Sequence, residues 1–394
     1  MTGAAVDAAS EGEDGNPTNA TLTGWPLLRF SRSAMASDFE VSFNRGQYPQ
    51  AAEAALAALD EVERLESVLS AFQSKSEISR INREAAQNTV TTSPEVWNLL
   101  KLCQQLSMET DGAVDITAST LWRLWGFAKR EGKVPPQEEI TAALQNVGRQ
   151  YMKFDNALQS VRFTKPGVEI SLGCIGKGAA IDSAVNKLRD LEVEHALLHG
   201  GRSSILAIGG RMQETWPLSP QSVQKNFPAN VSGELLEPTR DRSVGWTIGI
   251  SHPVRPSYCA GGTSYCAGGT SRRIAKVRLA GVNCAGGTEA LGTSGSQHQF
   301  FIHQGKRYSH IIDPRSGMPA EGVLMATVIA PTAALADALS TAFFVLKPEQ
   351  TAEYCRQHPG IAALLVLPGE TEANDCRIVH FGFEQNQIRF FRTT

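Results

Sequence analysis

The densest group of chemically capable side chains lies in the segment His310-Ile-Ile-Asp313-Pro-Arg315-Ser-Gly317. Its proline and final glycine are typical of a turn, which would gather an imidazole, a carboxylate and a guanidinium. The imidazole can move a proton near neutral pH, and the guanidinium can clamp a phosphate or orient Asp313. The alternative is a strand that ends in an Asp-Pro turn with a surface arginine, and this segment alone favours neither interpretation.

A carboxylate and a hydroxyl, Asp337 and Thr341, stand four residues apart in an apolar run that follows Thr332. Thr332 is a good helix N-cap, and residues four apart share one face of a helix. Two hard oxygen atoms suit Mg²⁺, which takes few protein ligands and keeps the rest of its shell for water and phosphate. The alternative is an aspartate satisfied by a backbone group or an arginine, with Thr341 hydrogen-bonded inside the helix.

A glycine-rich segment, Ser171-Leu-Gly-Cys174-Ile-Gly-Lys177-Gly178, directly precedes a predicted amphipathic helix. Glycines let a backbone approach a ligand closely, and a helix N-terminus favours anions. The segment is not a Walker A loop, which would need Gly at position 171 and Ser or Thr at position 178. An ordinary structural loop is therefore the alternative.

Two earlier segments add aromatic rings. Phe72 precedes the polar turn Ser76-Glu-Ile-Ser79, and its ring can stack on a flat ligand. The segment Asp111–Thr117 leads into a stretch with Trp122 and Trp125, and such a pair is more typical of a core than of a cofactor site.

The elements that must position these segments begin with helices and continue with interleaved strands. Apolar periodicity predicts helices over 51–69, 94–110 and 179–191, besides the one after Thr332. Alternation predicts strands over 39–43, 196–199, 204–208, 246–250, 274–279, 298–303 and 323–329. This order indicates an α+β fold and not a doubly wound parallel sheet.

Composition excludes several classes of protein. The 394 residues are 42% hydrophobic and 20% charged with a formal charge of -3, which is typical of a globular protein and argues against a nucleic-acid partner. Residues 1–24 are expected to be a disordered tail, and residues 1–28 contain no Lys or Arg and no apolar run typical of a signal peptide. No stretch is apolar enough to span a bilayer. The sequence as written therefore predicts a cytoplasmic protein, or a periplasmic or membrane-anchored one if a signal segment has been removed.

The seven cysteines are odd in number and scattered, which favours reduced thiols over a disulfide framework. A Cys-Ala-Gly-Gly-Thr word occurs three times, starting at Cys259, Cys266 and Cys284. Structural zinc sites have closer cysteine pairs or a matching histidine, so a glycine-rich loop grown by local duplication is the favoured interpretation.

Together and in this order, the segments resemble the FAD:protein FMN transferases, or ApbE-like flavin transferases. The resemblance runs from about Ala34 to about Leu346. It covers the Met35 segment, LSAFQSKSEISRIN, TDGAVDITASTLWRLWGF, SLGCIGKGAAID, HGGRSSILAIGG, TSG, HIIDPRSG and ADALSTA. It implies a single ApbE-like α+β domain over 25–394 with mixed or antiparallel sheets, packed helices, an FAD cleft and a Gly/Cys-rich insertion at 255–290.

The resemblance implies a Mg²⁺-dependent transferase that moves FMN from FAD to a Thr or Ser hydroxyl of an acceptor protein and releases AMP. The alternatives are an FAD pyrophosphatase that yields FMN and AMP, and a non-catalytic flavin-binding protein. Ser171 keeps the last alternative open, because the family usually has Asp at that position.

The resemblance also implies roles for individual residues. Mg²⁺ would be held by Asp337, Thr341 and the backbone carbonyl of Cys174. His310 would be the base that activates the acceptor hydroxyl, with Asp313 in the same catalytic group. The residues implied to contact or enclose FAD are Met35, Phe72, Ala113, Val114, Asp115, Ser171, Lys177, Ile312 and Arg315.

Overall fold

The computed structural model describes residues 26–211, 245–251, 253, 273–279, 289–296, 299–369, 376–385 and 387–391. The predicted N-terminal tail and the three Cys-Ala-Gly-Gly-Thr words lie outside these residues.

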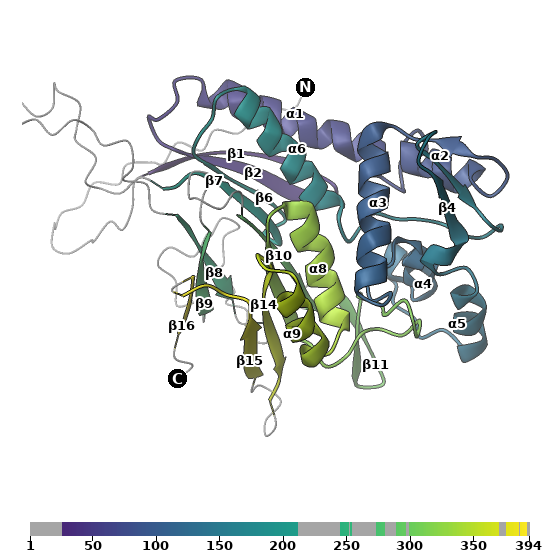
Figure 1. The fold of residues 1–394 in the computed structure, drawn as a ribbon. Coiled ribbons are helices and arrows are strands. Elements are labelled where there is room, and N and C mark those ends of the chain that lie inside the picture. The colour runs from purple at the N-terminus through teal and green to yellow at the C-terminus, as the bar shows by residue number, and fades with distance from the viewer. Residues whose placement is uncertain are drawn as a thin grey trace, which may run out of the picture.

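An antiparallel sheet forms the centre of the protein (Figure 1). Within the described residues its eight strands, in spatial order, are β1 (Leu27–Ala34), β2 (Ser37–Asn44), β6 (Ala196–Gly200), β7 (Ser204–Ile208), β10 (Glu289–Gly295), β13 (Met325–Ala330), β14 (Ala362–Pro368) and β15 (Cys376–Phe381). Together with the interleaved helices, this sheet confirms the α+β prediction.

Helices cover one face of the sheet (Figure 1). Four pack on the strands: α1 (Ala51–Leu69), α6 (Gly176–Asp190), α8 (Ala333–Val345) and α9 (Pro348–Gln357). A further helix, α3 (Pro94–Glu109), packs against α8. Alternate strand residues such as Leu206 and Val328 join the core beneath these helices.

A small sheet covers the opposite face. It consists of β8 (Trp246–Ser251), β9 (Arg273–Leu279) and β16 (Ile388–Phe390). Ile274, Val277 and Leu279 of β9 pack with Ile205 and Ile329 of the central sheet. Because both faces are covered, β7 and β13 are buried along their whole length and read as continuous apolar runs.

The remaining elements lie together beside α3 (right of Figure 1). They are α2 (Glu77–Glu84), α4 (Ser119–Leu124), α5 (Gln137–Leu144), the sheet β3 (Val90–Thr91), β5 (Ser160–Phe163) and β4 (Met152–Asp155), the hairpin β11 (Phe300–His303) and β12 (Lys306–Ser309), and the short 3₁₀ turns Ile116–Ala118, Phe127–Lys129 and Arg149–Tyr151. Trp125 is fully buried among Leu121, Phe127 and Ile312, which confirms that it is a core residue.

The elements differ from the prediction in several places. The segment Ser76–Ser79, expected to be a polar turn, is the N-cap and first turn of α2, because the Ser76 hydroxyl accepts the N–H of Ser79. Other elements without a predicted counterpart include α4, α5, α9, β1, β14 and β15.

Helix α6 begins at Gly176, before the predicted start at residue 179, because a side chain of another helix satisfies the N–H of Gly178 in its first turn. Strand β10 was not predicted, since its Gly-Thr-Ser-Gly end contains two glycines and a single β-branched residue. It forms because β7 and β13 pair with it on both sides.

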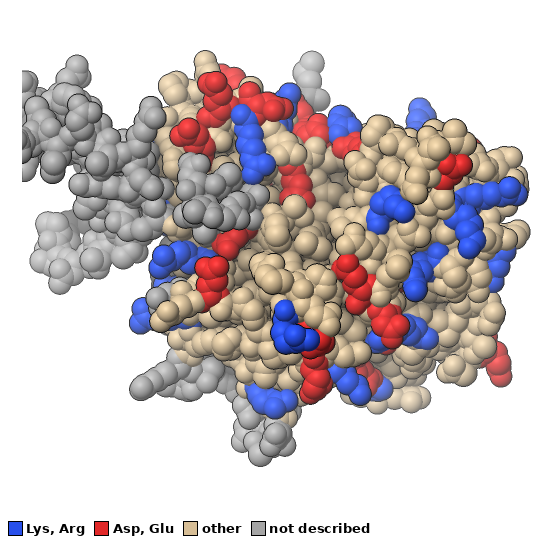
Figure 2. All heavy atoms as spheres, viewed as in Figure 1, with Lys and Arg blue, Asp and Glu red and all other residues tan. Residues whose placement is uncertain are grey.

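Acidic and basic side chains are intermingled on the face shown in Figure 2, where the centre is largely uncharged. Among the described residues, no helix has the length and apolarity to cross a membrane.

Candidate active site

Two glycines bring the central helices and the sheet into direct backbone contact. At Gly292 of β10, a Cβ atom would lie 2.3 Å from the Ala336 carbonyl oxygen of α8. At Gly178, in the first turn of α6, a Cβ atom would lie 2.1 Å from the Ala333 carbonyl oxygen. Only glycine allows approaches this close, so the first turn of α8 lies directly on β10 and against the first turn of α6.

Asp337 of α8 points into this junction and is buried. Its Oδ2 accepts the backbone N–H of Gly178 at 2.8 Å, and its Oδ1 accepts the Ser204 hydroxyl at 2.5 Å. Burial raises the pKa of the carboxyl, while the nearby Lys177 ammonium and the two hydrogen bonds act in the opposite direction. The two bonds leave lone pairs on both oxygens that can face a cation.

The two helices cap each other. Asp182 of α6 accepts the N–H groups of Ala333 and Ala334, the first residues of α8, at 2.8 and 2.9 Å. Asp337 of α8 in turn accepts from Gly178 at the start of α6. Each carboxylate satisfies backbone donors that a helix leaves without an internal partner, and each lies at the positive end of a helix dipole.

The Thr341 hydroxyl belongs to a small hydroxyl cluster one helical turn beyond Asp337. It lies 3.3 Å from the Asp337 carbonyl oxygen and 3.2 Å from the Ser294 hydroxyl, which in turn lies 2.8 Å from the Ser340 hydroxyl. A hydroxyl has one proton and two lone pairs, so these contacts are compatible with a cation on the Thr341 oxygen.

Cys174 precedes α6 by two residues. Burial of its thiol raises the pKa to about 12. The group that the resemblance implies at a cation site is its backbone carbonyl. The described residues contain no cluster of three or more His, Cys, Asp or Glu side chains able to hold a metal.

Lys177, the second residue of α6, reaches the turn between β6 and β7. Its Nζ donates to the Ser203 hydroxyl at 2.6 Å. A Cβ on Gly201, in the same turn, would lie 2.8 Å from the Ser37 hydroxyl and 3.9 Å from the Lys177 Nζ. The turn that contains Met35, which has a φ of 49°, leads into Ser37 and therefore lies beside the β6–β7 turn that Lys177 contacts.

The side chains that were predicted to gather at His310, Asp313 and Arg315 make two separate sets of contacts. Asp313 and Arg315 form a bidentate ion pair, with Oδ1 2.8 Å from Nε and Oδ2 2.8 Å from a terminal nitrogen. This pair raises the pKa of the Arg315 guanidinium. The Nδ1 of His310 lies 2.9 Å from the Gln299 carbonyl oxygen, and its ring meets Phe127 edge to face.

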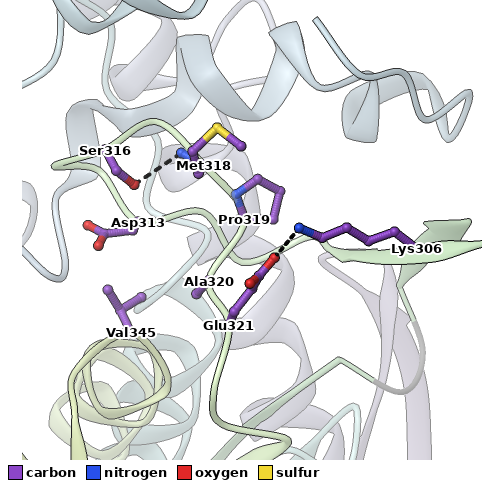
Figure 3. Close-up of a pocket in the computed structure, with 8 residues that line it drawn as sticks. All are labelled: Lys306, Asp313, Ser316, Met318, Pro319, Ala320, Glu321 and Val345. Carbon is purple, nitrogen blue, oxygen red and sulfur yellow. Dashed lines mark hydrogen bonds and ion pairs between the residues drawn. The ribbon is translucent and has the colours of Figure 1, made fainter. Parts of the chain in front are cut away.

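A cavity of about 360 Å³ opens beside the Asp313 turn (Figure 3). Asp313 and Val345 lie on one side of it, and the Lys306–Glu321 ion pair lies on the other. Val345 follows Thr341 by one helical turn of α8. The Asp313 turn and the helix that carries Asp337 and Thr341 therefore border the same cavity.

The segment Asp111–Asp115 lies next to this turn, because a Cβ on Gly112 would lie 3.6 Å from the Arg315 Cγ. Ala113 and Val114 are buried. The Asp115 carboxylate accepts hydrogen bonds from the N–H and the hydroxyl of Thr117, and from the N–H of Arg149 at 3.0 Å.

Three other residues implied in FAD binding lie in different surroundings. The Ser171 N–H donates to the carbonyl oxygen of Ile116 at 2.8 Å, which ties the glycine-rich loop to the turn directly after the Asp111–Asp115 segment. Phe72 is 76% exposed, and its ring lies 6.5 Å from that of Trp122. Ile312 is buried in the Trp125 cluster and forms an isolated bridge with Pro319.

Three residues that contact the site were not identified from the sequence: Asp182, Ser203 and Ser204. Each is a polar side chain whose partner lies far away along the chain, so no local spacing marks it. For the two serines, the only signal is their position directly after the Gly200-Gly201-Arg202 turn.

Comparisons with known proteins agree with the geometry. The family model described as "ApbE family" matches residues 35–365. An FAD:protein FMN transferase of Klebsiella pneumoniae (strain 342) is 27% identical over 304 residues, which are 77% of this chain and 78% of that protein. A protein of the same name from Escherichia coli (strain K12) is 26% identical over 306 residues, covering 76% of this chain and 73% of that protein.

Solved structures agree as well. The ApbE protein of Thermotoga maritima has a TM-score of 0.68 at 27% identity and covers 89% of this chain and 96% of its own. The apo form of the Pseudomonas stutzeri flavinyl transferase ApbE has a TM-score of 0.67 at 25% identity and covers 91% and 96%. Since the family model matches most of the chain, this protein belongs to the ApbE family.

Proposed function

We propose that the protein is an FAD:protein FMN transferase, which moves FMN from FAD to a Ser or Thr hydroxyl of an acceptor protein and releases AMP. The observation that carries the proposal is the junction of α6, α8 and β7 in a chain of the ApbE family, where the Asp337 carboxylate lies near Lys177 and one helical turn from Thr341. The curated relatives named above support the activity by name.

The donor atoms at this junction fit Mg²⁺. A carboxylate, a hydroxyl and a backbone carbonyl, from Asp337, Thr341 and Cys174, are hard oxygen ligands, and a set this small leaves room for phosphate oxygens. When bound, the cation would neutralise negative charge on the FAD pyrophosphate. Ser171 adds a neutral hydroxyl at the loop where the family usually has a carboxylate.

FAD would lie between this junction and the Asp313 turn. Lys177 would supply positive charge to its phosphates, and Arg315, held by Asp313, would supply a second cation. Met35, Ile312 and the Ala113–Asp115 segment would line the pocket. The exposed ring of Phe72 would cover the flavin.

The transfer requires one base. A bond forms between the acceptor oxygen and the FMN phosphorus, the bond from that phosphorus to the AMP phosphate oxygen breaks, and the hydroxyl proton is taken up. A carbonyl oxygen can only accept, so the contact with Gln299 places a proton on Nδ1 of His310 and leaves the lone pair on Nε2. We assign the proton uptake to Nε2.

The test is incubation with FAD, Mg²⁺ and a panel of Ser/Thr-containing acceptor proteins, followed by denaturing electrophoresis and AMP quantification. We expect flavin fluorescence that survives denaturation, together with AMP. Free FMN and AMP without labelled protein would indicate a pyrophosphatase, and FAD binding without AMP would indicate a non-catalytic flavin-binding protein. His310→Ala should slow transfer by about 10²–10⁴-fold, the range typical of general base catalysis.

A further inference from the structure

Two adjacent serines contact both charged groups of the junction. They follow the turn between β6 and β7, in which Gly201 and Arg202 have φ values of 59° and 62°. The Ser203 hydroxyl accepts from the Lys177 Nζ at 2.6 Å, and the Ser204 hydroxyl donates to the Asp337 Oδ1 at 2.5 Å. One turn therefore links a cation on α6 to a carboxylate on α8.

The positions of both serines are fixed by the sheet. Ser204 is completely buried and pairs across the ladder with Gly292, the residue whose missing Cβ lets α8 lie on the sheet. The Ser203 carbonyl oxygen accepts the Thr293 N–H at 2.6 Å, which attaches the turn to β10. The backbone of both serines is therefore held in place, and only rotation about χ1 can move the hydroxyls.

These contacts restrict the two charged groups in different ways. The Asp337 carboxylate is held at both oxygens, by Ser204 on Oδ1 and by the Gly178 N–H on Oδ2, so its plane is fixed along with the remaining lone pairs. Lys177 has a flexible stem with three donor hydrogens, and one bond to Ser203 restrains its end while two donors remain.

We propose that Ser203 and Ser204 are positioning residues of the active site. Ser204 orients Asp337 for a divalent cation, and Ser203 holds the Lys177 ammonium at the FAD phosphates. The assignment rests on the proposed function, because it presumes that the junction binds a cation together with FAD. Groups that orient a metal ligand typically change metal affinity by about 10–100-fold when they are removed.

The test compares Ser204→Ala and Ser203→Ala with Ser160→Ala. Ser160 is an equally buried strand serine on β5 whose hydroxyl has no hydrogen-bond partner among the described residues, so its removal controls for loss of a buried hydroxyl. Mn²⁺ affinity is measured by electron paramagnetic resonance at saturating FAD, and FAD affinity by flavin fluorescence at saturating Mn²⁺.

We expect Ser204→Ala to weaken Mn²⁺ binding by about 10-fold or more, within the range typical of residues that orient a metal ligand. Ser203→Ala should weaken FAD binding and leave Mn²⁺ affinity within about twofold, because it acts on Lys177 and not on the carboxylate. Ser160→Ala should change neither. Unchanged Mn²⁺ affinity in Ser204→Ala, or identical losses in all three variants, would overturn the assignment.

Because Ser204 is fully buried, circular dichroism checks the fold of each variant, and Ser204→Cys provides a second substitution of similar size with a weaker donor. It should show the same direction of change as alanine, and a wild-type Mn²⁺ affinity in a folded Ser204→Cys would count against the proposal. AMP release by the unchanged protein reports separately on the proposed function, since the two binding measurements need no turnover.

Discussion

At the scale of single residues, the site depends on a carboxylate placed where water is scarce. Asp337 is buried, so the pKa of its carboxyl is raised, and the charged form is favoured by Lys177, Ser204 and the Gly178 N–H. A bound cation would favour the charged form of the Asp337 carboxyl further. A buried carboxylate with a raised pKa, held by specific partners, is the pattern expected of a functional carboxylate.

Asp337→Asn tests this role with almost no change in volume. The amide keeps an acceptor for Ser204 but presents an N–H₂ group towards the Gly178 N–H, and it removes the charge that attracts the cation. We expect Mg²⁺-dependent AMP release to fall by more than about 100-fold, beyond the range of residues that merely orient a ligand. Retained activity with normal Mg²⁺ dependence would show that the cation binds elsewhere.

His199 on β6 predicts a pH dependence of stability. It is buried, and burial lowers its pKa to about 4, with the positive charges of Arg202 and Arg29 acting in the same direction. Between pH 6.5 and 4 the unfolded chain therefore binds more protons than the folded one, so stability decreases as the pH falls through this window. The contribution of this one group is at most about 3 kcal/mol.

The measurement is urea unfolding of the wild type and His199→Gln at pH 7 and pH 4.5. The wild type should lose more free energy of unfolding on acidification than the variant, which has no group that titrates at this position. Equal losses in the two proteins would show that His199 is not neutral in the folded state.

At the scale of elements, the reciprocal caps explain why two segments far apart in sequence form one site. Asp182 and Asp337 each satisfy the N-terminal donors of the other's helix. The two helices therefore fix each other's position as well as their own ends. The cap from Asp182 also predicts a pH dependence opposite in sign to that of His199.

Burial raises the pKa of Asp182 to about 6, despite the two N–H donors from α8. Between about pH 4 and 6 the folded chain binds more protons than the unfolded one, so this group makes the protein less stable as the pH rises, by at most about 3 kcal/mol. Asp182→Asn resembles the neutral carboxyl. The free energy of unfolding of the variant minus that of the wild type should therefore increase as the pH rises from 4.5 to 7. A constant difference between the two proteins would contradict the prediction.

Gly292 tests the close approach of α8 to the sheet. A Cβ there would lie 2.3 Å from backbone, whereas a Cβ on Gly295 of the same strand meets its nearest neighbour at an ordinary 3.5 Å. Gly292→Ala should lower the free energy of unfolding by about 1–3 kcal/mol or more, as overpacking does, and weaken Mg²⁺ dependence because Asp337 moves. Gly295→Ala should stay within about 0.5 kcal/mol of the wild type, and an equal loss in both variants would point to backbone flexibility as the cause.

The elements that the sequence predicted are those with a strong apolar period. Helix 51–69 has its predicted bounds, and strand 204–208 does as well. Strand β10 was missed because pairing with β7 and β13, and not its own residues, makes it a strand. The ion pair of Asp313 with Arg315 joins residues two apart, so their spacing in the sequence predicts it. The hydrogen bond from Ser204 to Asp337 spans 133 residues and depends on the order of strands in the sheet, so no local pattern predicts it.

At the scale of the whole molecule, the proposed site would be assembled from the first hairpin, the glycine-rich loop, the β6–β7 turn and α8. Met35 and Thr341 stand at opposite ends of the folded chain, yet both belong to the implied pocket. An unfolded chain cannot present these groups together. Ligand binding should therefore be confined to the folded state and should stabilise the whole protein.

This leads to a prediction for thermal unfolding with FAD and Mg²⁺, alone and together. A ligand at about 100 times its Kd adds about 2.7 kcal/mol to the free energy of unfolding. If Asp337 and Lys177 act on the same pyrophosphate, FAD and Mg²⁺ together should raise Tm by more than the sum of their separate effects, because each improves the binding of the other. Asp337→Asn should retain the shift with FAD alone and lose the extra shift with Mg²⁺. Purely additive shifts in the wild type would mean that the cation and FAD occupy independent sites, and the junction of α6, α8 and β7 would then need a different explanation.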